Sequence, residues 1–119
     1  MKSYTDLDVW IESRKLVKSI YVLTKSFPKE EMYGLTSQIR RSSISIPSNI
    51  AEGIGRQSNK ETLHFLHIAK GSLNEVETQL YLSVDLGFVS NKDLKDILEN
   101  VITSKKLLNG FIKYFKSLI

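Results

Sequence analysis

Apolar and small side chains recur at alternating steps of three and four residues in four stretches of the chain. The most regular stretch is the third, whose repeating positions are Leu66, Ala69, Leu73, Val76, Leu80 and Ser83. These steps place the side chains on one face of an α-helix, and the alternation of period two that marks a strand is nowhere sustained. The pattern therefore predicts an all-α protein.

The other three stretches have the same periodicity. The first has its face at Val9, Leu16, Val17, Ile20 and Phe27. The second face consists of Leu35, Ile39, Ser42, Ile46, Ile50 and Gly53. The fourth consists of Ile97, Val101, Ser104, Leu108, Phe111, Phe115 and Leu118. Short connections between such faces predict an antiparallel up-down-up-down four-helix bundle. A chain of 119 residues has the size of one domain, which we place at residues 1–119.

Polar residues and chain-breaking residues indicate where these helices begin and end. Three helix starts pair an N-cap oxygen with an acid three residues later: Thr5 with Asp8, Ser58 with Glu61 (the full capping-box spacing), and Ser90 with Asp93. Breaks after the first and third helices are expected at Phe27-Pro28 and Leu86-Gly87-Phe88. Pro47 lies inside the second helix, where it lacks an amide hydrogen and crowds the Ser43 carbonyl, so a kink is predicted there.

The composition removes several classes of protein. The chain has no cysteine, which excludes disulfide scaffolds, iron–sulfur clusters and thiol catalysis. No apolar run has the length of a signal peptide or the roughly 20 residues of a membrane span, so a cytoplasmic protein without membrane contact is expected. The net charge of +4 permits an anionic partner without requiring one.

The residues that catalysis would need are not arranged for it. Glu61-x-x-His64 matches half of the carboxylate–imidazole pattern of di-iron bundles, but no second copy occurs on a partner helix. Gly53-Ile54-Gly55 lacks the residues that complete a phosphate-binding loop. Glu52 lies four residues before Arg56, a spacing that favours a structural ion pair. We therefore expect no enzymatic activity, no metal site and no cofactor.

Some apolar residues fall outside the predicted core faces. On the second helix these are Ile44 and Ala51, flanked by Arg40 and Arg41, and on the third helix they are Ile68, Leu82 and Leu86. Scattered apolar residues are normal on any protein surface. A second apolar stripe on each of two helices nevertheless favours self-association, because a surface helix usually has one stripe.

Basic residues gather on the outward faces of the first and fourth helices. The first helix carries Arg14, Lys18 and Lys25 on this face, and the fourth carries Lys106 and Lys113. These helices are neighbours in an up-down bundle, so the two stripes are expected to merge into one basic wall. Such a wall suits the phosphate backbone of a nucleic acid. The alternative interpretation is an ordinary solvated helix face.

The second helix carries the residues of a resemblance. The run LTSQIRR at Leu35–Arg41, the run SIPSNIAEG at Ser45–Gly53, and Arg56 resemble the small bacterial four-helix-bundle proteins encoded in intervening sequences of 23S ribosomal RNA genes. Asp8-Val9-Trp10, Phe27–Glu31, and Phe65–Ser72 with Glu75 extend the likeness over nearly the whole chain.

The resemblance implies a homo-oligomeric ring, with a pentamer as the expected form. Related accessory variability proteins of diversity-generating retroelements are similar in fold and imply nucleic acid and a reverse transcriptase as partners. We therefore hypothesise a non-enzymatic ring that binds RNA or DNA, with RNA favoured. Its phosphate contacts would be Arg14, Lys18, Lys25, Lys106, Lys113 and Arg56. The alternative is a protein–protein scaffold or accessory subunit without nucleic-acid contact, in which the arginines serve only subunit contacts.

Overall fold

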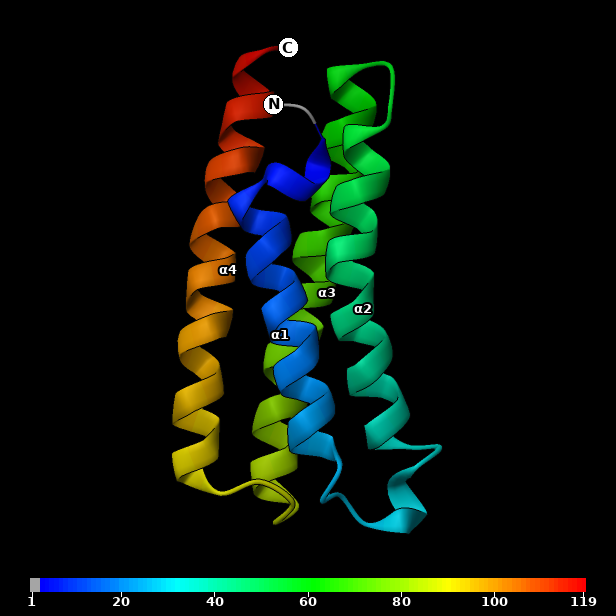
Figure 1. Ribbon diagram of the computed structural model, residues 1–119, viewed down its shortest axis with the longest axis vertical. Coiled ribbons are helices and arrows are strands. Elements are labelled where there is room, and N and C mark those ends of the chain that lie inside the picture. The colour runs from blue at the N-terminus through cyan, green and yellow to red at the C-terminus, as the bar shows by residue number, and fades with distance from the viewer. Residues whose placement is uncertain (1–2) are drawn as a thin grey trace.

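The computed structural model describes residues 3–119, in which four long α-helices and two short 3₁₀ segments account for the regular structure (Figure 1). The long helices are α1 (Asp8–Thr24), α2 (Leu35–Ile54), α3 (Asn59–Asp85) and α4 (Asn91–Ser117). The 3₁₀ segments are η1 (Tyr4–Asp6) and η2 (Lys29–Glu31). No strand occurs among these residues, which confirms the prediction of an all-α, four-helix protein.

The four helices lie side by side along the longest dimension of a molecule that measures 45 × 25 × 22 Å. Each helix packs against the next one along the chain, and α4 also packs against α1. Figure 1 shows the α2–α3 connection at the same end of the molecule as the end of α4, with the other two interhelical connections at the opposite end.

The core is formed by the predicted faces of all four helices. Its central side chains, which have 1% exposure or less, include Leu16, Ile20, Ile39, Ile46, Leu66, Leu73, Val101 and Leu108. All six predicted positions of α3 are buried. The prediction for the end of α4 was wrong at Leu118, which is 46% exposed, while Ile112 is buried instead. The reason is that α4 ends at Ser117, so Leu118 lies beyond the last turn that can hold it against the bundle.

Two of the three predicted N-caps are confirmed. The Ser58 hydroxyl accepts from the Glu61 amide at 3.1 Å, and the Ser90 hydroxyl accepts from the Asp93 amide at 3.1 Å. The Glu61 carboxylate does not complete the expected box with a backbone amide, since it accepts from the Ser58 hydroxyl at 3.3 Å.

The third predicted N-cap, Thr5, was wrong. Helix α1 begins at Asp8 after Leu7, which provides no side-chain cap. A capping box forms one turn earlier, where the Ser3 hydroxyl accepts from the Thr5 amide and the Asp6 carboxylate accepts from the Ser3 amide. These two hydrogen bonds stabilise η1, so the polar residues near Thr5 cap the 3₁₀ turn and not the α-helix.

The break after α3 depends on one glycine. Gly87 has a φ of +81°, a left-handed conformation that side-chain-bearing residues rarely adopt. Its amide donates to the Val84 carbonyl, and the next amide, of Phe88, donates to the Ser83 carbonyl at 2.8 Å. The helix end is therefore satisfied by its own turn, as the Leu86-Gly87-Phe88 pattern predicted.

A second glycine sets the distance between α2 and α3. A Cβ atom at Gly53 would lie 2.9 Å from the Phe65 Cβ and 3.1 Å from the Thr62 carbonyl oxygen. The Thr62 hydroxyl also donates to the Gly53 carbonyl at 2.7 Å. The backbones of the two helices are thus in contact where the chain turns from one into the other.

Replacing Gly53 with alanine is expected to destabilise the protein by about 1–3 kcal/mol, because the new methyl group must push α2 away from α3. The matched control is Gly110→Ala in α4, where a Cβ would meet nothing within 4 Å. Alanine there is expected to stabilise the protein by up to about 1 kcal/mol through helix propensity. Denaturant unfolding of both variants checks the prediction, and stabilisation by Gly53→Ala would contradict it.

Candidate nucleic-acid and subunit interfaces

The five basic residues predicted to form a wall lie on two helices that pack against each other. Arg14 and Lys18 are exposed on α1, Lys25 is exposed directly after its last residue, and Lys106 and Lys113 are exposed on α4. Among residues 3–119 none of the five forms an ion pair. Arg14 also lies over the Trp10 ring, with its guanidinium carbon 4.9 Å from the ring centroid.

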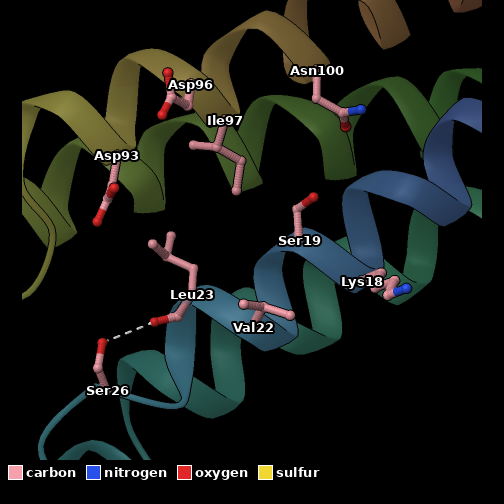
Figure 2. A pocket seen from close by; sticks show the side chains of 9 residues that line it. All are labelled: Lys18, Ser19, Val22, Leu23, Ser26, Asp93, Asp96, Ile97 and Asn100. Carbon is pink, nitrogen blue, oxygen red and sulfur yellow. Dashed lines mark hydrogen bonds between the residues drawn. The ribbon is translucent and has the colours of Figure 1, made fainter.

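Acidic residues interrupt this wall at the seam between α1 and α4. A groove of about 510 Å³ lies there, and Figure 2 shows Asp93, Asp96 and Asn100 on α4 facing Val22 and Leu23 on α1. Lys18 lines the same groove. The predicted wall did not include these carboxylates, because it paired α1 with the C-terminal half of α4, whereas α1 also packs against the start of α4. The positive surface is therefore not uniform along the seam.

Arg56 is occupied within its own protomer. Its Nη2 atom lies 2.5 Å from the Glu52 carboxylate, and its guanidinium carbon lies 4.6 Å from the centroid of the Phe65 ring. The predicted Glu52–Arg56 pair is thereby confirmed. Because both partners are substantially exposed, this pair contributes little to stability. It also offsets the positive charge that Arg56 would present to a phosphate.

The two adjacent motif arginines differ in their surroundings. The half-buried Arg40 donates from Nε to the Thr24 hydroxyl at 2.9 Å, and its guanidinium carbon lies 4.5 Å from the centroid of the Tyr21 ring. Arg40 therefore joins α2 to α1 inside the protomer. Arg41 is exposed. The sequence did not distinguish these two arginines. They point 100° apart around α2, and which of them meets α1 depends on where α1 packs, which the sequence does not give.

The predicted apolar contact residues form two separate patches. The α2 patch consists of Ile44, which is 42% exposed, and the half-buried Ala51. Ile44 lies in a groove with Tyr21 of α1. The α3 patch is spread along its helix: Leu82 and Leu86, 45% and 57% exposed, are one turn apart, whereas Ile68, 38% exposed, lies about 21 Å before Leu82 at 1.5 Å per residue.

These patches lie on different flanks of α2. Leu82 of the α3 patch shares a groove with Glu75, and the Glu75 carboxylate accepts from the Ser42 hydroxyl of α2 at 3.4 Å. The α3 patch therefore lies beside the flank of α2 that faces α3, whereas the α2 patch lies beside α1. The molecule thus carries two different apolar surfaces and not one continuous face.

A further groove was not predicted from the sequence. It has a volume of about 340 Å³ and lies where the end of α1 meets the beginning of α2. Its lining includes Tyr33, whose side chain is 97% exposed, and Thr36, which is 2% exposed. In the sequence this groove is marked by Tyr33 before Gly34, and an aromatic residue in a connection between helices does not by itself indicate a binding site.

The residues considered for a metal site, and the helices as possible membrane spans, have the following places in the structure. Glu61 and His64 are both exposed, and the described part of the chain contains no group of three or more His, Cys, Asp or Glu side chains placed to hold a metal ion. Within residues 3–119, none of the helices combines the length and the apolar character of a membrane span.

Replacing Arg40 with alanine is expected to lower the free energy of unfolding by about 1–2 kcal/mol, because a hydrogen bond and a cation–π contact between α1 and α2 are lost. Arg41→Ala is the control and is expected to change it by less than about 0.5 kcal/mol. Denaturant unfolding at one fixed protein concentration checks both values. Equal losses in the two variants would contradict the difference described here.

Comparison with known proteins identifies the family. The chain matches no curated protein. It is similar to a crystal structure of a protein of unknown function from the S23 ribosomal protein family of Bacteroides thetaiotaomicron, with 28% identity and a TM-score of 0.81. That similarity covers 88% of this chain and 98% of the other. Residues 5–110 match the family described as 23S rRNA-intervening sequence protein, and the chain therefore belongs to this family.

Proposed function

We propose that this protein is a non-enzymatic, homo-oligomeric nucleic-acid-binding protein of the cytoplasm, with RNA as the favoured ligand. The observation that carries the proposal is the set of five exposed cations along the neighbouring helices α1 and α4, including Lys25 at the end of α1, none of which forms an ion pair within residues 3–119. Lysine and arginine bind phosphates by displacing condensed counterions, without reading the base sequence. The family's association with an intervening sequence of 23S rRNA is the reason for favouring RNA.

The proposed assembly is a ring, with five subunits as the expected number. A ring requires a heterologous contact, in which two different surfaces of the protomer meet. The α2 patch and the α3 patch are two such surfaces, and Arg41 borders the first. Each protomer in this proposal is an up-down-up-down bundle with α2 bent at Pro47. The positions of the interhelical connections in Figure 1 support the first part of that description.

A ring changes what a modest basic wall can do. Each protomer offers a few phosphate contacts, and these are weakened at the seam by Asp93 and Asp96. Several copies on one long polyanion bind together, because the second and later contacts are intramolecular. Oligomerisation therefore compensates for a small net charge of +4 per chain.

A protein–protein scaffold is the second candidate, and a specific observation favours it. Three positive side chains that the sequence offered for external contacts already have partners inside the protomer: Arg14 on Trp10, Arg40 on Tyr21 and Thr24, and Arg56 on Glu52 and Phe65. In this alternative the basic residues are ordinary surface and the apolar patches receive another protein.

The wall is tested by charge reversal. Changing Arg14, Lys18 and Lys25 together to glutamate is expected to abolish binding to a structured RNA, because the cations that bind phosphate become repulsive. The affinity of the native protein is expected to fall steeply with salt, by several logarithmic units per unit of log salt concentration. Fluorescence anisotropy at several salt concentrations measures both effects.

The control for this variant is the simultaneous change of Lys29, Lys60 and Lys92 to glutamate, which alters the net charge equally but involves exposed lysines on η2, α3 and α4 outside the wall. This control is expected to retain most of the affinity. Equal losses in the two triple variants would contradict a defined binding face. Absence of RNA and DNA binding by the native protein at low salt would favour the scaffold.

The ring is tested by blocking one patch at a time. Ile44→Glu and Leu82→Glu are each expected to give species of lower mass, because a charge in either patch removes the contact. A mixture of the two variants is expected to form a dimer, since the intact α3 patch of the first can still meet the intact α2 patch of the second. Light scattering after size-exclusion chromatography measures these masses.

Ile102→Glu is the control for these variants, because Ile102 is 50% exposed on α4, outside both patches. It is expected to keep the native mass. Arg41→Ala, measured in the same assay, tests whether the arginine at the border of the α2 patch contributes to the subunit contact. An unchanged mass in both Ile44→Glu and Leu82→Glu would overturn this assignment of the subunit interface.

A further inference from the structure

The groove at the beginning of α2 contains a buried hydroxyl group without a partner. Thr36 is 2% exposed, and its Oγ1 atom forms no hydrogen bond with any group in residues 3–119. Other buried threonines satisfy this group: the Thr24 hydroxyl donates to the Ile20 carbonyl at 2.8 Å, and the Thr62 hydroxyl donates to the Gly53 carbonyl at 2.7 Å. An unsatisfied buried hydroxyl costs free energy, so a donor or acceptor that reached it would stabilise the protein. The Ser104 hydroxyl and the side-chain oxygens of Gln79 and Asn100 also lack a partner in the same part of the chain, and the groove at Thr36 differs from their surroundings in its charge.

The charge of this groove differs from that of the other grooves described. Arg40 and Arg41 line it together with Ser37 and with Ile44 of the α2 patch, and no acidic residue does, so a ligand here would lie at the border of the proposed subunit contact. Carboxylates line the groove between α1 and α4 (Asp93 and Asp96), the groove beside Leu82 (Glu75), and a further groove between Arg56 and Phe65 at the start of α3 (Glu61). The groove at the beginning of α2 is therefore positive and rich in donors, which suits a group with several anionic oxygens.

One carboxylate lies near this groove but is already engaged. Glu31 accepts from the Leu35 amide through Oε1 at 3.0 Å, at the first residue of α2. The negative charge of Glu31 thus lies at the N-terminus of α2, where the helix dipole is positive and the interaction is favourable. Glu31 is not among the residues that line the groove. Within residues 3–119, Glu31 forms no ion pair with Arg40 or Arg41, and of these two arginines it is Arg41 that has no partner inside the protomer.

An aromatic ring stands at the edge of the groove. The Tyr33 side chain is 97% exposed, far more than Tyr81 at 48% or Tyr114 at 56%. A fully exposed flat ring is a platform on which a nucleic-acid base can stack. A phosphate group in the groove would hold the adjoining base beside this ring.

We propose that this groove binds one nucleotide unit, with its phosphate on Arg41, Ser37 and the Thr36 hydroxyl and its base stacked on Tyr33. A threonine in a helix populates two χ1 rotamers, so its hydroxyl turns toward a ligand without movement of the backbone. The proposal rests on the proposed function in taking this unit to be part of a nucleic-acid strand. A free nucleotide presents the same chemistry, and the experiment separates the two sources.

The test uses two pairs of matched variants and two probes. Thr36→Val removes the unpartnered hydroxyl at constant shape, and Thr62→Val removes a hydroxyl that has partners. Tyr33→Ala removes the exposed ring, and Tyr81→Ala removes a less exposed ring on α3. The probes are adenosine 5′-monophosphate and a labelled single-stranded adenylate 10-mer, each titrated against the full chain.

Thr36→Val and Tyr33→Ala are each expected to weaken binding of the 10-mer about fivefold or more, while Thr62→Val and Tyr81→Ala leave it unchanged. Thr36→Val is expected to melt at the native temperature or above it, and Thr62→Val below it, because only the second loses hydrogen bonds. Binding of the 10-mer without the mononucleotide assigns the groove to a strand, and binding of both assigns it to free nucleotides as well.

Three results would overturn the proposal. The first is unchanged binding of the 10-mer by Thr36→Val and Tyr33→Ala. The second is a melting temperature of Thr36→Val as low as that of Thr62→Val, which would mean that the hydroxyl has a partner in the protomer. The third is a lower oligomeric mass of Tyr33→Ala, which would assign the groove to a second copy of the chain.

The failure of this proposal can be told apart from failure of the basic wall. If the Arg14, Lys18 and Lys25 triple variant loses structured RNA while Thr36→Val keeps the 10-mer, the groove proposal fails and the wall stands. If the triple variant keeps both ligands while Thr36→Val loses the 10-mer, the wall fails and the groove stands.

Discussion

The contact between α2 and α3 is the constraint on which the arrangement of the other helices depends. Small residues let the two helices approach closely, since Gly53 leaves no room for a Cβ against α3. Farther along, the Ser72 hydroxyl donates to the Ser45 hydroxyl at 2.8 Å, and Asn49 donates to the same oxygen from the next turn of α2. Hydroxyl groups in this close contact are satisfied across the interface, so they hold the register of the two helices without leaving a buried polar group unpaired.

This contact also determines which side chains of α2 meet α1. Because Ser42 and Ser45 face α3, the helical period turns Arg40 toward α1, where Thr24 and Tyr21 receive it. The next residue, Arg41, is turned a further 100° and is exposed. The different roles of two adjacent arginines therefore follow from the orientation that the small residues impose.

The sequence predicted the parts of the fold that repeat along a helix. The faces of all four helices were recognisable because burial recurs with the helical period, and the six positions of α3 were all correct. Helix ends were less predictable, as Thr5 and Leu118 show, because a few local hydrogen bonds decide between neighbouring starting points. Contacts between helices, such as that of Arg40 with Tyr21, could not be predicted from the sequence, since they depend on which helix faces meet in space.

Three of the four arginines in the chain stack on an aromatic ring of the same protomer. Arg14, Arg40 and Arg56 each lie over an aromatic ring of the same protomer, at 4.9, 4.5 and 4.6 Å from the ring centroid. Stacking of this kind fixes the plane of a guanidinium group and reduces the entropy that it loses on binding. Arg41 has no such ring. Arg41 is therefore the arginine with the most freedom to adapt to an anionic ligand. It lines the same groove as the unpartnered Thr36 hydroxyl and the exposed Tyr33 ring. An exposed arginine, an exposed tyrosine ring and a buried hydroxyl without a partner thus line one groove, as expected of a site that is completed by a ligand.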